Sequence, residues 1–317
     1  MMRKTILIFP VFLFVIALFL TSCASKKEVM IQVYETSAAG HKLTPLEVFS
    51  KGEVVSKITI NPKEKRQVIT GFGGAFTESS ATVLNKLSPE KSDQIINAYF
   101  SEKGAAYSLT RTHMNSCDFS LSNYSYTEVE DDTQLEHFSI AHDKDDLIPM
   151  IKAAQAASKD GFKLFASPWT AAPWMKDNNS WVGGKLKPEY YQTWALFFSK
   201  YADAYKAQGI DIWGFTVENE PMGNGDNWES MVFSPQEMTH FVQNYLGPTL
   251  EANRQQDLVI LGFDQNRGDL KQWVDVMFKD QASSKYFDGT LFIGMKAPMT
   301  ISQKSWNMHT IKHPINI

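Results

Sequence analysis

Cysteine, clustered basic residues and metal-binding patterns are all scarce in this chain of 317 residues. Its two cysteines, Cys23 and Cys117, allow one disulfide at most, so no disulfide framework can hold the fold together. The seven histidines form no His-Glu-x-x-His pattern and no tight cluster with cysteine, which argues against a metal site. Positive and negative residues are interspersed and the net charge is −4, so the clustered basic face of a nucleic-acid-binding protein is missing. We therefore expect no metal and no nucleic-acid partner.

A long apolar segment of transmembrane length is also missing. The apolar run at residues 6–20 follows a basic start (MMRK) and leads into residues 20–23 (LTSC). It is shorter than a comfortable membrane span, and its flanks are typical of an export signal. The segment resembles a bacterial lipobox, in which the cysteine becomes the lipidated first residue of the mature protein. An ordinary signal peptide with a chance cysteine is the alternative.

The lipobox interpretation makes residues 1–22 a lipoprotein signal peptide and Cys23 the lipidation site. Acyl chains then hold the protein on a membrane surface without any spanning helix. We expect the protein in the bacterial cell envelope, lipid-anchored and either periplasmic or on the outer-membrane surface. Cys117 is left as a small core residue.

Past the leader, the chain has no internal repeat, low-complexity stretch or interdomain linker. Residues 54–60 and 67–70 read as strands, and residues 23–66 as a whole as a polar linker with one or two strands. From residue 71 short apolar runs alternate with longer helical ones, the βα rhythm of a parallel sheet. Ser88 before Pro89 and the capping box of Ser234 and Glu237 mark helix starts. The pattern predicts helices at 147–157 and 188–208 and strands at 107–110, 163–166, 212–217 and 258–263.

Polar and aromatic residues gather where the predicted strands end: Arg111, Trp169, Asn219, Glu220 and Asp264. Each residue alone could simply cap a helix. In a (β/α)₈ barrel, however, the carboxyl ends of the strands meet at one face, and that face carries the active site. Taken together, the five residues predict a polar site at the mouth of such a barrel.

Two of the acidic residues, Glu218 and Glu220, flank Asn219 at the end of one strand. Side chains alternate along a strand, so both carboxylates should point to the same side if the strand stays regular. Pro221 cannot donate to a ladder and ends the strand. A carboxylate at a barrel mouth beside an amide is a candidate for general acid/base catalysis.

Several motifs occur in the order found in glycoside hydrolase family 30, between about residues 67 and 290. They are residues 71–78 (GFGGAFTE), 116–120 (SCDFS), 166–170 (ASPWT), 193–195 (TWA), 218–221 (ENEP) and 246–250 (LGPTL). Together these motifs are highly specific. The sequence resembles the glucosylceramidase-like branch most closely, while related branches cleave β-1,6-glucan or xylan.

The resemblance implies an α/β fold, a (β/α)₈ TIM barrel with a side β-domain, and a retaining mechanism without metal or cofactor. By motif position Glu220 matches the general acid/base and Asn219 the residue that contacts the sugar 2-hydroxyl. Residues that line the glycone pocket are matched by Arg111, Asp118 and Trp169. The implied substrate is a β-glucoside or glucan. Glu78 and Asp264 stand only near related positions.

The family's catalytic nucleophile has no counterpart in the sequence, because no Glu or Asp occurs after Asp288. Read in a shifted frame, the codons for residues 292–296 (FIGMK) can encode His-Trp-Tyr-Glu, the expected family strand. A frameshift near Thr290 would explain this, and a short homologue with its own ending is the alternative. We expect residues 67–290 to form a partial barrel of about six βα units and residues 291–317 to be an aberrant tail. The last barrel units and most of the side β-domain should then be missing, with the strand or strands in residues 23–66 as what remains of that domain.

Three outcomes for the function follow. In the first, the chain is by family a retaining β-glycosidase of the glucosylceramidase or β-glucosidase type, inactive here because the nucleophile is absent. The alternative is a non-catalytic surface glycan-binding lipoprotein, or an enzyme with β-1,6-glucanase specificity. The third outcome is a pseudogene product that never folds. A binding protein would have no reason to keep Glu220, so the first interpretation is preferred.

Overall fold

The computed structural model describes residues 32–47, 57–223 and 227–294. The chain divides into two compact units, Met1–Glu64 and Lys65–Ile317. In the first unit β1 (Val33–Glu35) and β2 (Thr44–Leu46) form an antiparallel pair. The leader and Cys23 lie outside the described residues. No helix within the described ranges is long and apolar enough to cross a membrane.

The strands expected near residues 54–60 and 67–70 are not found. Residues 57–60 and 67–70 are irregular, and residues 54–56 lie outside the described part of the chain. Ile58, Ile60 and Val68 are more than 80% exposed, so little of these apolar side chains is buried among the described residues. A strand needs a neighbour for its backbone groups, and an alternating pattern alone does not provide one.

The larger unit contains a parallel sheet whose six strands follow one another in chain order, β3-β4-β5-β6-β7-β8. Sequential parallel strands joined by helices are the arrangement of a (β/α)₈ barrel, and the described residues contain six of its eight strands. The prediction of an incomplete TIM barrel is confirmed. The strands are β3 (Ala75–Phe76), β4 (Leu109–Met114), β5 (Lys163–Pro168), β6 (Gly214–Thr216), β7 (Val259–Asn266) and β8 (Gly289–Gly294).

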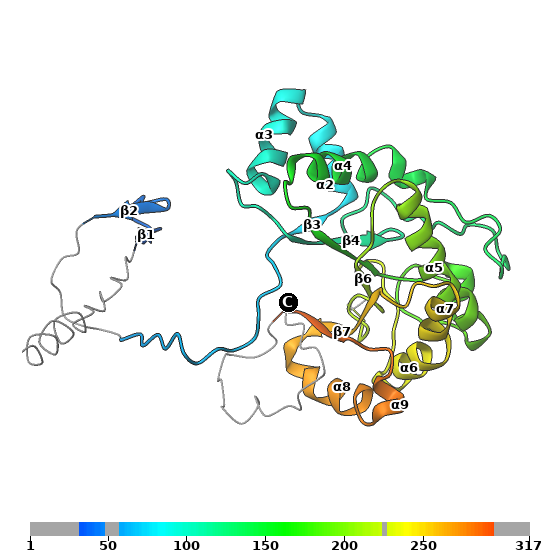
Figure 1. Ribbon diagram of the computed structural model, residues 1–317. Coiled ribbons are helices and arrows are strands. Elements are labelled where there is room, and N and C mark those ends of the chain that lie inside the picture. The colour runs from blue at the N-terminus through cyan, green and yellow to red at the C-terminus, as the bar shows by residue number, and fades with distance from the viewer. Residues whose placement is uncertain (1–31, 48–56, 224–226, 295–317) are drawn as a thin grey trace, which may run out of the picture. The chain divides into compact units, whose positions relative to one another are not determined.

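Helices cover the outer face of this sheet, as the ribbon in Figure 1 shows. They are α2 (Glu78–Asn85), α3 (Pro89–Phe100), α4 (Leu147–Ala157), α5 (Tyr191–Ala207), α6 (Pro235–Phe241), α7 (Gly247–Ala252), α8 (Leu270–Met277) and α9 (Gln281–Ser284). Short 3₁₀ turns occur at Ala141–Lys144, Pro173–Met175, Pro188–Tyr190 and Arg267–Asp269, and a π-turn at Val242–Leu246 joins α6 to α7. The predicted caps at Ser88 and Ser234 are confirmed, the latter with both bonds of its capping box.

Two apolar layers hold the sheet. The main core lies between strands and helices and is rich in aromatic rings such as Trp194, Phe198 and Phe215. A smaller cluster of Leu109, Phe165, Leu261 and Leu291 joins four different strands, β4, β5, β7 and β8. Side chains from alternate strands stack in such layers inside a barrel. Leu291 belongs to the sixth strand, β8, which continues to Gly294 and so passes the expected boundary at residue 290.

One glycine of the first family motif has a clear steric reason. A Cβ atom on Gly73 would lie 1.6 Å from the carbonyl oxygen of Leu109, which is far inside contact distance. The chain leading into β3 thus runs against β4 too closely for any side chain. A side chain at residue 73 would therefore push the first two strands apart.

Candidate active site

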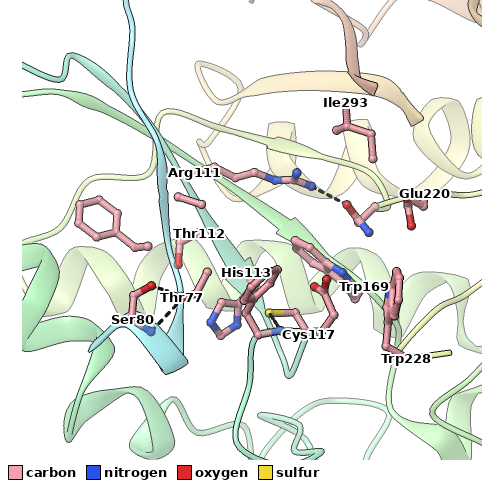
Figure 2. Close-up of a pocket in the computed structure, with 15 residues that line it drawn as sticks. Thr77, Ser80, Arg111, Thr112, His113, Cys117, Trp169, Glu220, Trp228 and Ile293 are labelled. Carbon is pink, nitrogen blue, oxygen red and sulfur yellow. Dashed lines mark hydrogen bonds between the residues drawn. The ribbon is translucent and has the colours of Figure 1, made fainter. Parts of the chain in front are cut away.

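A pocket of about 360 Å³ opens beyond the carboxyl ends of β3 to β6. All five residues predicted from the motifs, Arg111, Asp118, Trp169, Asn219 and Glu220, line it. Figure 2 shows Arg111 reaching toward the chain segment that carries Asn219 and Glu220. The structure thus brings together residues that are up to 109 positions apart, from 111 to 220.

Arg111 organises the pocket floor through three charge-assisted or polar bonds. Its Nε donates to Ser167 Oγ at 2.9 Å, and its Nη2 donates to Asn219 Oδ1 at 2.9 Å and Asp264 Oδ2 at 2.8 Å. The guanidinium also lies over the Trp169 ring, 4.8 Å from the ring centroid. Arg111 therefore holds both the Asn219 amide, which is expected to contact a sugar hydroxyl, and the neighbouring Trp169 ring.

Asp264 supports Arg111 and does not line the pocket. Its side chain is fully buried, and Oδ2 accepts a second bond from Thr216 Oγ1 at 2.6 Å. Burial raises the pKa of Asp264, and the adjacent Arg111 guanidinium opposes that rise. The residue acts through Arg111, which corrects the idea that it might itself meet a substrate.

The acid/base candidate Glu220 sits on a turn and not on a strand. β6 ends at Thr216, and Glu220 has a left-handed backbone with φ of +48°. The Glu220 N–H donates to the Asp264 carbonyl at 3.0 Å and the Asn219 N–H to the Pro168 carbonyl at 2.7 Å. Such a conformation is costly for a non-glycine residue and persists only where neighbouring bonds hold it.

This turn separates the two glutamates that sequence alternation placed on one side, so that expectation is wrong. Glu218 is fully buried and lies outside the pocket lining, whereas Glu220 is part of it. Side chains do not alternate here because the strand ends two residues before Glu218 and Glu220 has a left-handed backbone conformation.

The charges around Glu220 suit a proton donor. Burial raises the pKa of Glu220, and the nearby carboxylates of Asp118 and Asp264 raise it further, while Arg111 lowers it. A general acid must keep its proton close to the working pH, so an upward shift is the direction that chemistry needs.

Asp118 lies at the exposed edge of the pocket, on the loop after β4. Partial burial raises its pKa, the Glu229 carboxylate adds to the rise, and a hydrogen bond with the Trp169 side chain opposes it. The carboxylate is held in place by Trp169 and keeps acceptor capacity for sugar hydroxyls.

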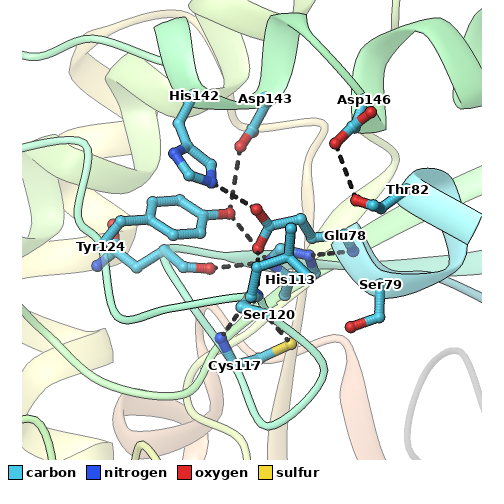
Figure 3. Close-up of polar contacts among 12 residues, drawn as sticks. Glu78, Ser79, Thr82, His113, Cys117, Ser120, Tyr124, His142, Asp143 and Asp146 are labelled. Atoms are coloured by element: carbon cyan, nitrogen blue, oxygen red, sulfur yellow. Dashed lines mark hydrogen bonds and ion pairs between the residues drawn. The ribbon is translucent and has the colours of Figure 1, made fainter. Parts of the chain in front are cut away.

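Glu78 faces away from the pocket, into a polar network behind its wall. Its Oε1 pairs with His142 Nε2 at 2.8 Å and its Oε2 accepts the Leu121 N–H at 3.0 Å. Figure 3 shows these contacts beside the bond from Tyr124 to Asp143. Glu78 therefore ties α2 to the loop after β4 and does not add its carboxylate to Asp118 and Glu220 in the pocket.

Other pocket residues had no strong signal in the sequence. Trp228 belongs to a loop without a motif, and Ile293 belongs to the stretch expected to be an aberrant tail. His113 follows Arg111 by two positions on β4, so its place on the same face could have been read from the strand period. Within the described ranges, no three His, Cys, Asp or Glu side chains are placed to hold a metal ion.

Comparison with known proteins agrees with this geometry. Residues 69–308 match the model of the glycosyl hydrolase family 30 TIM-barrel domain. The chain belongs to glycosyl hydrolase family 30. For a member of this family, the pocket at the strand ends is where the substrate site is expected.

The similar proteins include some named glucosylceramidase and some named endo-β-1,6-glucanase. The chain is 37% identical over 271 residues to the putative glucosylceramidase 3 of Caenorhabditis elegans, covering 81% of this chain and 52% of that protein. It is 37% identical over 241 residues to the lysosomal acid glucosylceramidase of Mus musculus, covering 73% and 47%. A solved endo-β-1,6-glucanase, BT3312, superposes with a TM-score of 0.75 at 32% identity, covering 84% and 61%. The chain spans about half the length of the curated relatives it matches.

Proposed function

We propose that the pocket binds the sugar of a β-glucoside and that Glu220 is its general acid/base. The observation that carries the proposal is the Arg111 network, which fixes Asn219 and Trp169 around a glutamate whose pKa is raised. Glucosylceramidase-type relatives make a β-glucosidic bond the first choice of substrate. In the reaction Glu220 would give its proton to the oxygen that leaves the anomeric carbon.

We further propose that this chain does not complete a retaining cycle alone. That cycle needs two carboxyl groups about 5 Å apart, one as acid/base and one as nucleophile. Among the described pocket residues the carboxylates are Asp118 and Glu220, and Asp118 is held by Trp169 at the pocket edge. The sequence holds no acidic residue after Asp288, and Glu78 faces elsewhere.

A β-1,6-glucan is the second candidate substrate, and two aromatic rings at the pocket favour it. Phe119 is 57% exposed and Trp228 is 37% exposed, and both line the pocket. Flat rings of this kind can stack on a second sugar unit. Tighter binding of gentiobiose than of octyl β-glucoside would support the glucan, and the reverse order would support a lipid-linked glucoside.

The binding proposal is tested with Asp118→Asn. We expect phenyl β-D-glucopyranoside to bind about 10-fold or more weakly, because a hydrogen bond from a sugar hydroxyl to a charged acceptor is lost. Titration calorimetry on the unmodified chain and the variant measures this. Asp146→Asn is the matched control, since Asp146 bonds Thr82 away from the pocket. Equal affinity of Asp118→Asn and the unmodified chain would refute the assignment of the pocket.

We also propose that Cys23 anchors the exported protein through acyl chains, as the lipobox-like segment indicates. Cys23→Ala should move the protein from the membrane fraction to the soluble fraction, because no other anchoring group is proposed. Fractionation of cells followed by immunoblotting measures the change, with Cys117→Ala as the control. If Cys23→Ala stays with the membranes, the lipid anchor is wrong.

A further inference from the structure

Lys176 is a buried cation that the proposed chemistry does not use. It follows the 3₁₀ turn Pro173–Met175, and its residue is 0% exposed. Burial lowers its pKa to about 8, while the charges of Glu218 and Asp177 oppose the fall. The amine therefore still carries its proton at neutral pH. Keeping a buried charge is expensive compared with an apolar side chain of similar size, so its bonds deserve a functional explanation.

The ammonium group of Lys176 bonds two segments that are far apart in the sequence. Its Nζ donates to Thr170 Oγ1 and to the Ser230 carbonyl, each at 2.8 Å. Thr170 comes directly after Trp169, and Ser230 comes two residues after Trp228. Both tryptophans line the pocket. The two bonds thus join the segments that carry these two pocket-lining tryptophans.

A third segment is linked to Lys176 by charge. The buried carboxyl of Glu218 interacts electrostatically with Lys176, although no hydrogen bond to either of its oxygens is formed in the structure. Glu218 lies two residues before Glu220, in the turn that gives the acid/base candidate its left-handed backbone. Thr170, Ser230 and Glu218 are therefore each within two residues of a pocket-lining side chain.

The loop that carries Trp228 has little regular structure of its own to hold it. Residues 227–234 contain no helix or strand, and residue 228 is exposed. Ser230 ties this loop to another segment: its N–H donates to the Trp181 carbonyl at 3.1 Å and its Oγ accepts the Gly183 N–H at 2.9 Å. The Lys176 bond adds the link from this point to the end of β5.

We propose that Lys176 is a positioning residue that fixes the distance between Trp169 and Trp228 and thereby sets the width of the pocket. This deepens the proposed function, because a sugar ring would lie between walls that Lys176 holds in register. The placement itself is a property of the protein and can be measured without any ligand. A side chain outside the pocket would then control how tightly a glycoside is held.

The test uses the whole chain labelled with 5-fluorotryptophan and ¹⁹F NMR, with resonances assigned by single Trp→Phe variants. Lys176→Met keeps the length of the side chain and removes the charge and both bonds. We expect the Trp169 and Trp228 resonances to shift or broaden, while that of Trp273, buried against Phe263, stays in place. Lys187→Met is the matched control: Lys187 also donates to a carbonyl, that of Trp174 at 3.1 Å. It should leave all three unchanged.

A milder variant distinguishes a local change at the pocket from a general loss of stability. Thr170→Val removes one acceptor of the cation but leaves Lys176 and the Ser230 bond in place. It should move the Trp169 resonance and leave that of Trp228 unchanged, a signature that a loss of stability alone would not produce. The proposal is overturned if Lys176→Met folds and moves neither resonance, or if Thr170→Val shifts Trp169, Trp228 and Trp273 alike.

Ligand binding then separates this inference from the proposed function. Phenyl β-D-glucopyranoside should bind Lys176→Met about 10-fold more weakly than the unmodified chain, since misplaced walls lose polar contacts to the sugar. If the unmodified chain binds no glycoside while the resonances shift as expected, the glycoside proposal fails and the role of Lys176 stands. If Lys176→Met and Thr170→Val both bind phenyl β-D-glucopyranoside as tightly as the unmodified chain does, the pocket width does not depend on Lys176 and the inference is wrong.

Discussion

Arg111→Met should lower the free energy of unfolding by about 3–5 kcal/mol, the range found when one member of a buried ion pair is removed. Asp264 is fully buried and has Arg111 as its ion-pair partner at 2.8 Å. Its other side-chain partners, the hydroxyls of Thr216 and Ser167, cannot neutralise an ionised carboxylate. Urea denaturation followed by circular dichroism measures the loss, provided the transition of the unmodified chain is cooperative.

The double variant Arg111→Met, Asp264→Asn is the control for this reading. An amide is neutral and tolerates the left-handed backbone of residue 264, whose φ is +50°. Removing both charges should therefore recover most of the stability lost in Arg111→Met. If the double variant is no more stable than Arg111→Met, the loss comes from packing against Trp169 and not from an unpaired charge.

The order of strands and helices could be read from the sequence because period and caps are local properties. The helix Leu147–Ala157 begins and ends where the pattern predicts, and the capping box at Ser234 forms. The site residues on β4, β5 and the turn after β6 meet because parallel strands end at one face. For this reason residues that are distant in the sequence, such as Arg111 and Glu220, line one pocket.

What the sequence did not predict depends on contacts between distant segments. Residues 67–70 have a strand-like composition, but the structure pairs them with no neighbour. The separation of Glu218 from Glu220 follows from bonds to Pro168 and Asp264, which local alternation does not contain. Lys176 gave no signal at all, because a lysine in a loop is ordinarily exposed and its burial is set by the fold.

The central proposal is that the described part of the pocket supplies a glycosidic acid, Glu220, but no nucleophile, and an external nucleophile tests this proposal. Azide can attack the anomeric carbon from the face opposite the leaving oxygen. The C1–O bond then breaks with its electron pair on the leaving group, which Glu220 protonates. The product is α-glucosyl azide, whereas a complete retaining cycle would release β-glucose.

The measurement follows phenol release from phenyl β-D-glucopyranoside with and without azide, and identifies the sugar product by NMR. The unmodified chain should release phenol only with azide and form the α-azide. Glu220→Gln should slow this release by about 100-fold or more, the lower range of general acid catalysis. Release of phenol and β-glucose without azide, abolished by Glu220→Gln, would contradict the account and show that the chain holds a complete catalytic pair.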